Sequence, residues 1–208
     1  MPASQASTAK PTPERILDAA EDLFAERGYT ATSLGDVADR VGIRSPSLYN
    51  HFRNKEALYA AVLDRLLEAF TAPLDELRQA PLTPEGIYRW LEITVRMHHQ
   101  RPNLARLLQH AALSGGPHTD TLVDRLFRPM FEPPESSPAP NLGPVHELQP
   151  WAVMGLNNLV MSYITMAPMY RDLLGEDPLG PQAEEKQVRL IMTLAELVLG
   201  TGEPATQN

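Results

Sequence analysis

The chain has 208 residues, 43% of them hydrophobic, and carries a formal net charge of -8. This length and apolar content suffice to bury a sizeable core, and the acidic balance argues against general attraction to polyanions. The absence of cysteine excludes disulfide bridges and metal sites with thiolate ligands, so nothing argues for export.

The N-terminal residues MPASQASTAK lack the apolar segment of a signal peptide. We therefore expect a disordered tail over residues 1–11 and a cytoplasmic protein. The triplet Thr12-Pro13-Glu14 is typical of a helix start, because proline is well tolerated in the first helical turn. Ile16, Ala20, Leu23 and Phe24 would form the inner stripe of this first helix, and Gly28 would end it.

A second helix should begin at Ser33, whose side chain can cap it while Asp36 reaches back to the cap's own N–H. The residues that would form its apolar stripe are Leu34, Val37, Ala38 and Val41. Gly42 tolerates the positive φ that ends a helix, and Ile43 can cover the junction. These signals predict two helices joined by a tight glycine turn.

The next helix is short and should run from about Pro46 to Phe52, with Ser45 as its cap. At about 1.5 Å rise per residue it is roughly 10 Å long, which fits a major groove about 12 Å wide. Asn54 should cap the following helix, leaving the charge of Lys55 free to point outward.

The segment from Arg40 to Lys55 holds four cations and no carboxylate, which predicts a local phosphate-binding face in an acidic protein. The alternative is a helix-turn-helix used only for packing, because helix pairs joined by glycine are common. The capped short helix, the basic segment and the aromatic pair Tyr49 and Phe52 favour DNA binding.

Residues 13 to about 60 resemble the N-terminal domain of the TetR family of bacterial transcriptional regulators. The features that carry the resemblance are Phe24, Gly28-Tyr29, Thr32-Ser33, Val37-Ala38, Gly42-Ile43, Ser47-Leu48-Tyr49, His51-Phe52, Lys55 and Leu58. Arg44 departs from the family, which more often has a small hydroxyl residue there, so this position could read guanine or hold phosphate. The resemblance implies a dimeric regulator with a C-terminal helical domain for ligand binding and dimerisation.

We expect the DNA contacts to come from the short helix and its borders. Base edges would be read by Arg44, Ser45, Pro46 and Asn50. Phosphates would be bound or supported by Thr32, Ser33, Ser47, Tyr49, His51 and Lys55.

The rest of the chain is predicted to be helical, with proline and glycine at the boundaries, and it contains no strand alternation. We expect the helix after Asn54 to end before Pro73. Further helices should cover residues 83 to about 99, 103–113 and 119–131. The fold class is therefore all-α. Residues 129–150 contain seven prolines and are interpreted as a loop, either a variable surface connection or a lid over a pocket.

The segment from Leu148 through Tyr170 contains no charged residue. Asn157, Asn158 and the flanking prolines argue against a membrane span, so this helix must be covered by protein. Together with a final helix from Gln182 to Leu199 it could form half of a four-helix homodimer interface, as the last two helices do in TetR proteins. A dimer would double the base contacts across a palindromic operator in double-stranded DNA.

An apolar cavity with few polar groups could bind a small apolar effector in this C-terminal part. The alternative interpretation of each candidate is an ordinary core residue. Eleven cations against eighteen carboxylates over residues 61–208 mildly favour a neutral or cationic effector. The candidate ligand-binding residues are Trp90, Met97, His98, Met130, Trp151, Met154, Asn158 and Met161.

Catalysis finds little support, because GxSxG, P-loop and HExxH motifs are absent. Adjacent His98 and His99 lie about 100° apart on a helix and cannot chelate one metal ion together. We therefore expect no enzyme, no cofactor and no metal. The predicted organisation is a tail (1–11), a DNA-binding domain (12–58), a ligand-binding and dimerisation domain (59–201) and a tail (202–208).

The sequence thus predicts a ligand-responsive repressor that an apolar molecule releases from DNA. Two alternatives stay open at this point. One is a DNA-binding regulator without an effector, and the other is a helical small-molecule-binding protein whose helix-turn-helix is only structural.

Overall fold

The computed structural model describes residues 10–79, 83–132 and 149–199. Every regular element in these ranges is helical, which confirms the predicted all-α fold. The predicted tails, apart from residues 10–11, and positions 133–148 of the predicted loop lie outside the described residues. The elements are α1 (Thr12–Ala31), α2 (Leu34–Val41), α3 (Ser45–Tyr49), α4 (Lys55–Arg78), α5 (Pro84–Gln100), α6 (Asn103–Ser114), α7 (Thr119–Leu122), the π-helical turn η1 (Val123–Phe127), α8 (Arg128–Phe131), α9 (Gln149–Thr165), α10 (Ala167–Leu174) and α11 (Pro181–Leu199).

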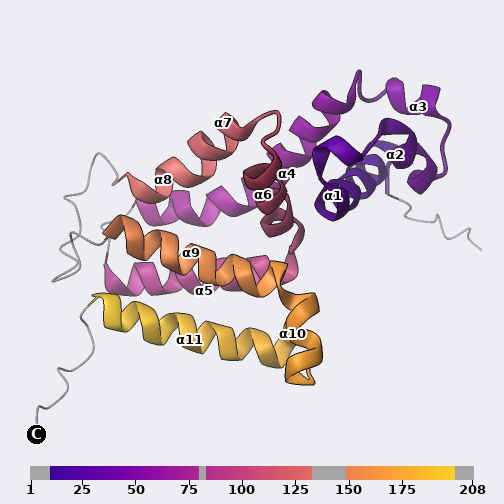
Figure 1. The fold of residues 1–208 in the computed structure, drawn as a ribbon. Coiled ribbons are helices and arrows are strands. Elements are labelled where there is room, and N and C mark those ends of the chain that lie inside the picture. Colours follow the sequence, from indigo (N-terminus) through magenta and orange to yellow (C-terminus); the bar gives the residue numbers. More distant parts are fainter. Residues whose placement is uncertain (1–9, 80–82, 133–148, 200–208) are drawn as a thin grey trace, which may run out of the picture.

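Helices α1 to α3 and the first turns of α4 form what we call the N-terminal unit, at one end of the molecule (Figure 1). Its predicted boundaries are largely confirmed. The Ser33 hydroxyl accepts the Asp36 N–H at 3.1 Å, and the Asp36 carboxylate accepts the Ser33 N–H at 2.8 Å. Gly42 has a φ of 75° and ends α2, and the N–H of Ile43 donates to the Ala38 carbonyl at 3.0 Å.

Helix α3 is shorter than predicted and starts one residue earlier. The Arg44 carbonyl accepts the N–H groups of Ser47 and Leu48 at 2.9 and 3.4 Å, so Arg44 and not Ser45 is the cap residue. The predicted end at Phe52 is also wrong, because His51 and Phe52 instead donate to the Leu48 carbonyl in the turn that follows.

The N-terminal unit has a complete core. The largest side chains in it that are less than 2% exposed are Ile16, Leu23, Phe24, Leu48 and Leu58. An aromatic group joins α1 to α4, since the Tyr59 ring lies 5.0 Å from the rings of both Phe24 and Tyr29. This packing fixes the direction in which α4 leaves the unit.

Helix α4 runs through the predicted domain boundary at residue 58 and also through Pro73, where we expected it to end before the proline. Proline removes one backbone donor from the helix. Burial of Phe70 and Leu74 on either side of it holds the helix together. At the far end the Arg78 guanidinium donates to the carbonyls of Pro129 and Glu132, which ties α4 to α8.

The remaining helices form what we call the C-terminal bundle. Helices α5, α9 and α11 lie side by side in it (Figure 1), around a core that includes Leu91, Val95, Val160, Val188 and Ile191. Helix α6 packs across α1 and connects the bundle to the N-terminal unit. The arrangement therefore places every candidate effector residue away from α3.

Three predictions for the bundle need correction. The single helix expected over 119–131 contains the π-helical turn η1. The apolar segment that ends at Tyr170 is divided at Met166 into α9 and α10. Residues 149–150 of the predicted loop are helical, and so are residues 129–131, which the predicted helix over 119–131 already included. Across the described ranges, no helix combines the length and the hydropathy that a bilayer span requires.

Candidate nucleic-acid interface

Helix α3 presents an exposed polar surface on an apolar support. Its only buried residue is Leu48, which is fully buried in the core of the N-terminal unit. Ser45, Pro46, Asn50 and His51 are exposed, Ser47 is half-buried, and the Tyr49 side chain is 55% exposed. A helix anchored through one side chain in this way can offer its remaining surface to a groove of DNA.

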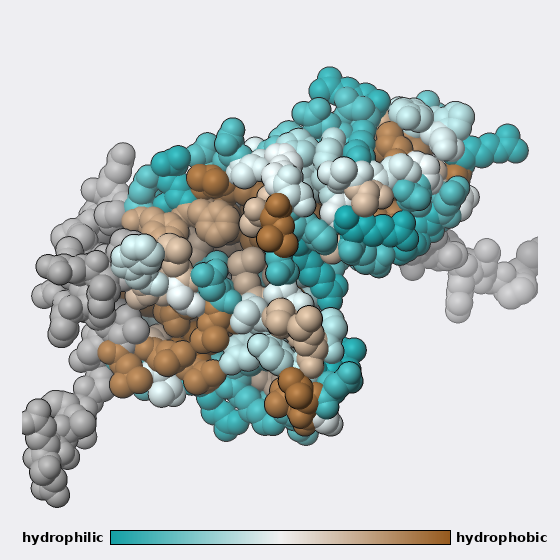
Figure 2. Space-filling view, in the orientation of Figure 1, coloured by the Kyte–Doolittle hydropathy of each residue, from teal (hydrophilic) through white to brown (hydrophobic). Residues whose placement is uncertain are grey.

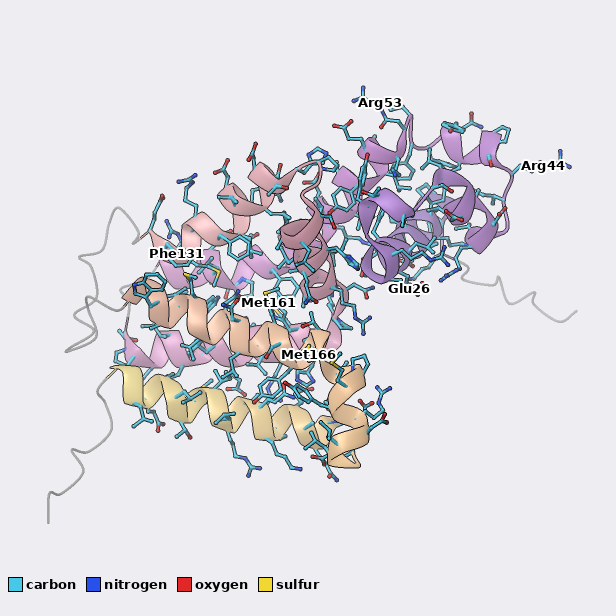
Figure 3. The ribbon with its side chains drawn as sticks, viewed as in Figure 1. Glu26, Arg44, Arg53, Phe131, Met161 and Met166 are labelled. Carbon is cyan, nitrogen blue, oxygen red and sulfur yellow. The ribbon has the colours of Figure 1, made fainter. Side chains whose placement is uncertain are left out.

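Arg44 and Arg53 lie at the two borders of α3 and extend away from the fold (Figure 3). Both are exposed, and neither has a hydrogen-bond or ion-pair partner within the described ranges. Arg40, by contrast, lies 3.6 Å from the Glu26 carboxylate. Arg44 and Arg53 are therefore available cations of the basic segment. Arg53 was missing from the predicted contacts, although its place in the turn between two helices was a signal that could have included it.

An open hollow of about 630 Å³ lies between the start of α2 and the turn after α3. Its lining includes the exposed guanidinium side chain of Arg53. The residues that line it are Thr30, Ala31, Thr32, Ser33, Leu34, Gly35, Tyr49, Arg53, Asn54 and Lys55.

Two predicted DNA contacts around this hollow are engaged within the protein. Thr32 is only 2% exposed, and its hydroxyl donates to the carbonyls of Gly28 and Leu23 at 2.9 and 3.2 Å. The Ser33 hydroxyl donates to the Asp36 carboxylate at 2.6 Å, and this hydrogen bond is the main reason why the pKa of Asp36 is lowered. Both side chains therefore support the start of α2, and a direct phosphate contact by their hydroxyls is not what the structure favours.

Lys55 also differs from the expectation of a free charge. Its ammonium donates to the carbonyls of Tyr29 at 2.9 Å, Thr32 at 3.0 Å and Thr30 at 3.4 Å, and it lies 4.3 Å from the centre of the Tyr29 ring. The side chain is half-buried. The sequence did not reveal these partners, because they are 23 to 26 residues away along the chain.

The predicted effector residues fall into two groups. Met97, His98 and Met161 are buried or half-buried beside the interior of the bundle, and the His98 ring packs edge-on against Phe70 with centroids 4.6 Å apart. Burial lowers the pKa of His98 to about 4, while its Nδ1 lies 2.9 Å from the Thr94 carbonyl oxygen.

The second group lies on the surface. Trp151 is 68% exposed, Met154 is 43% exposed, and Asn158 is exposed as well. The two remaining candidates are not on the surface: Trp90 and Met130 are half-buried, and Trp90 packs against the core shared by α5, α9 and α11. The eight predicted residues therefore do not line one common site within a single chain. Among the described residues no three His, Cys, Asp or Glu side chains are placed to hold a metal ion.

Comparison with known proteins agrees with this geometry. Residues 16–62 match the family model described as bacterial regulatory proteins, tetR family. The chain is 34% identical over 113 residues to the HTH-type transcriptional regulator RutR of Escherichia coli, which covers 53% of this chain and 51% of RutR. It is 48% identical over 62 residues to the transcriptional repressor KstR2 of Rhodococcus jostii, covering 30% and 27% of the two chains. The chain thus spans about half the length, or less, of these curated relatives.

Solved structures share the whole fold. The ketosteroid transcriptional regulator KstR2 of Mycobacterium tuberculosis aligns over 91% of this chain and 97% of its own with a TM-score of 0.64 and 18% identity. The fatty acid degradation regulator FadR of Bacillus halodurans aligns over 97% and 100% with a TM-score of 0.57 and 16% identity. The curated relatives are named as regulators of transcription, in agreement with the prediction that this chain is not an enzyme. Residues 16–62 therefore resemble the tetR family of bacterial regulatory proteins, and the chain as a whole shares the fold of these solved structures.

Proposed function

We propose that this protein is a sequence-specific DNA-binding regulator of transcription that reads the major groove with α3. The observation that carries the proposal is the exposed polar surface of α3 between Arg44 and Arg53, two cations without a partner in the part of the chain that the structure describes. Because the whole chain has a net charge of -8, this surface is the favoured site for a polyanion. Such a regulator works beside the chromosome, in the cytoplasm.

The proposed base contacts come from Arg44, Ser45, Pro46 and Asn50, because these residues are exposed at the start and the end of α3. Arg44 can pair with guanine through two hydrogen bonds. Arg53 is the proposed phosphate cation, together with the polar side chains of Ser47, Tyr49 and His51.

A homodimer is part of the proposal, because one short reading helix makes few base contacts. Two copies would place two α3 helices in successive major grooves about 34 Å apart on a palindromic operator. Support comes from the exposed apolar residues Trp151 and Met154 on α9 and Leu190 and Leu197 on α11. Figure 2 shows hydrophobic residues along α9 and between α9 and α11.

We further propose a small apolar effector that binds in the C-terminal bundle and releases the protein from DNA, which makes it a repressor. The half-buried side chains of Met97 and Met161 beside neutral His98 offer a mostly apolar environment. The two structural neighbours are named for a ketosteroid and for fatty acid degradation, and both of these compound classes have a largely apolar carbon skeleton. An effector must favour one dimer state by about 5.5 kcal/mol to move the population from 1:99 to 99:1.

Selection of bound fragments from a random duplex library tests the DNA proposal. Enrichment of a palindromic sequence is the expected result, and failure to enrich any sequence would overturn it. The Arg44→Ala variant should then lose about 1–3 kcal/mol on the selected site, with relaxed preference at the contacted base pair. Arg40→Ala is the matched control, since Arg40 already lies beside Glu26. Equal loss by Arg44→Ala on selected and random DNA would contradict its role in reading bases.

A further inference from the structure

The ammonium group of Lys55 has no hydrogen-bond donor left for DNA. A lysine carries three N–H donors. In this protein the three carbonyls of Tyr29, Thr30 and Thr32 lie within 3.4 Å of Nζ, and the Tyr29 ring covers another side of it at 4.3 Å. A phosphate could recruit this charge only by leaving carbonyl oxygens without their partner.

These three carbonyls belong to the segment that joins the end of α1 to the start of α2. Gly28, with φ 76° and ψ 171°, kinks α1, so that its last residues, 29–31, continue as a helical turn in a new direction. Thr32 fixes the segment from one side through its hydroxyl. Lys55, the first residue of α4, fixes it from the other side. The end of α1, the start of α2 and the start of α4 thus meet at one cation.

We propose that Lys55 is a positioning residue, which holds α2 and the hollow beside it at the angle to α4 that DNA reading needs, and that Arg53 is the cation that meets phosphate at this hollow. This proposal rests on the proposed DNA-binding function. The two residues stand two positions apart and both line the hollow, yet only Arg53 lacks a partner among the described residues. Of these two positively charged residues, only Arg53 therefore has its charge available to DNA.

Affinity measured over a series of salt concentrations separates the two roles. The salt slope is the steepness with which the logarithm of the binding constant falls as the logarithm of the salt concentration rises. Removal of one phosphate-binding cation should lower the size of this slope by about 0.9. We expect Lys55→Met to weaken binding to the selected duplex about 10- to 100-fold, as for removal of a hydrogen-bonded charge, while the salt slope on a random duplex stays unchanged. Arg53→Met, the matched control, should weaken binding to both duplexes and lower the slope.

Two results of these measurements would overturn the proposal. A slope lowered by Lys55→Met as much as by Arg53→Met would make Lys55 a phosphate contact. A lower unfolding temperature with an unchanged ratio of selected to random affinity would make it a purely structural residue.

A second measurement needs no variant and no selected site. The Tyr29 ring should shift the NMR signals of the Lys55 ε-methylene protons upfield, and we expect this shift to persist when a random duplex is added. Return of these signals to their unperturbed position with DNA would overturn the proposal. If the library selection enriches nothing, the DNA-reading function fails, whereas the shift in the DNA-free protein still reports whether Lys55 holds the α1–α2 segment.

Discussion

The N-terminal unit and the C-terminal bundle differ in how completely one chain buries them. In the N-terminal unit the apolar side chains of α1, α2 and α4 close around Leu48, and the surface of the unit is mainly polar (Figure 2). In the bundle α9 carries no charged residue, yet Trp151 and Met154 on it are exposed. The first region is complete within one chain, whereas the second leaves apolar surface for another molecule to cover.

Polar side chains are hydrogen-bonded in both regions. Around α2 the capping pair Ser33 and Asp36, the buried Thr32 hydroxyl and the Lys55 ammonium are all hydrogen-bonded within the unit. In the bundle, His98 is neutral because burial opposes its charge. The comparison teaches that the N-terminal unit is closed by its own core and hydrogen bonds, while α9 in the bundle keeps large apolar side chains exposed.

The largest expected effect tests whether the N-terminal unit depends on its closed core. Leu48→Ala should lower the free energy of unfolding by about 2–5 kcal/mol, because the side chain is fully buried beneath α3. Urea denaturation measures the change. Leu113→Ala on α6 is the control, since Leu113 is 79% exposed and should change stability by less than about 0.5 kcal/mol. Similar losses of unfolding free energy for both variants would show that burial of Leu48 does not stabilise the N-terminal unit more than an exposed leucine does.

The second prediction tests the interior of the bundle through pH. The pKa of His98 is about 4 in the folded chain and about 6.5 in the unfolded chain. Between these two pH values the unfolded chain binds a proton on His98 and the folded chain does not. The contribution of His98 to stability is therefore intact above about pH 6.5 and is lost as the pH falls toward 4. The loss should reach about 3 kcal/mol at pH 4.

His98→Asn keeps a donor near the Thr94 carbonyl and removes the titrating ring. Thermal or urea unfolding between pH 7 and pH 4 should then show a weaker pH dependence than the wild-type protein measured in parallel. An identical pH dependence in both proteins would mean that His98 is accessible to protons in the folded bundle.

The smallest expected effect tests what covers α9. Trp151→Ala should weaken self-association by about 2 kcal/mol, the range for a large aromatic residue at an interface, and leave the helical content unchanged. Sedimentation at several protein concentrations measures it. Met169→Ala on α10 is a control of similar exposure, at 65% against 68%. Unchanged association for Trp151→Ala, with loss only of effector binding, would assign this surface to the effector.

Much of the N-terminal unit could be predicted from the sequence because its signals are local. Ser33 and Asp36 are three residues apart, Gly42 ends its helix through its own backbone, and Asn54 caps α4 by accepting the Ala57 N–H at 2.7 Å. The residues expected to contact DNA at the ends of α3, Arg44, Ser45, Pro46 and Asn50, are exposed in the structure. Their contacts with DNA remain predictions.

What could not be predicted depends on residues far apart in the chain. Helix α4 continues through Pro73 because burial on either side offsets the missing donor, and this burial exists only in the bundle. The eight effector candidates were chosen because they are mostly large apolar residues in predicted helices. Residue type and helical spacing do not show which face of a helix meets the core. Trp151 and Met161 belong to one helix, yet one is exposed and the other packs on the interior.

The sequence by itself determined the all-α fold, the helix-turn-helix and the caps of α2 and α4, because these depend on backbone conformation and hydrogen bonds within a few residues. Only the tertiary structure decided which cations are free. Arg53 and Lys55 have nearly the same place and the same charge in the sequence. The folded chain brings three carbonyls to Lys55 and none to Arg53 among the described residues, so the same charge holds the protein in one case and faces solvent in the other.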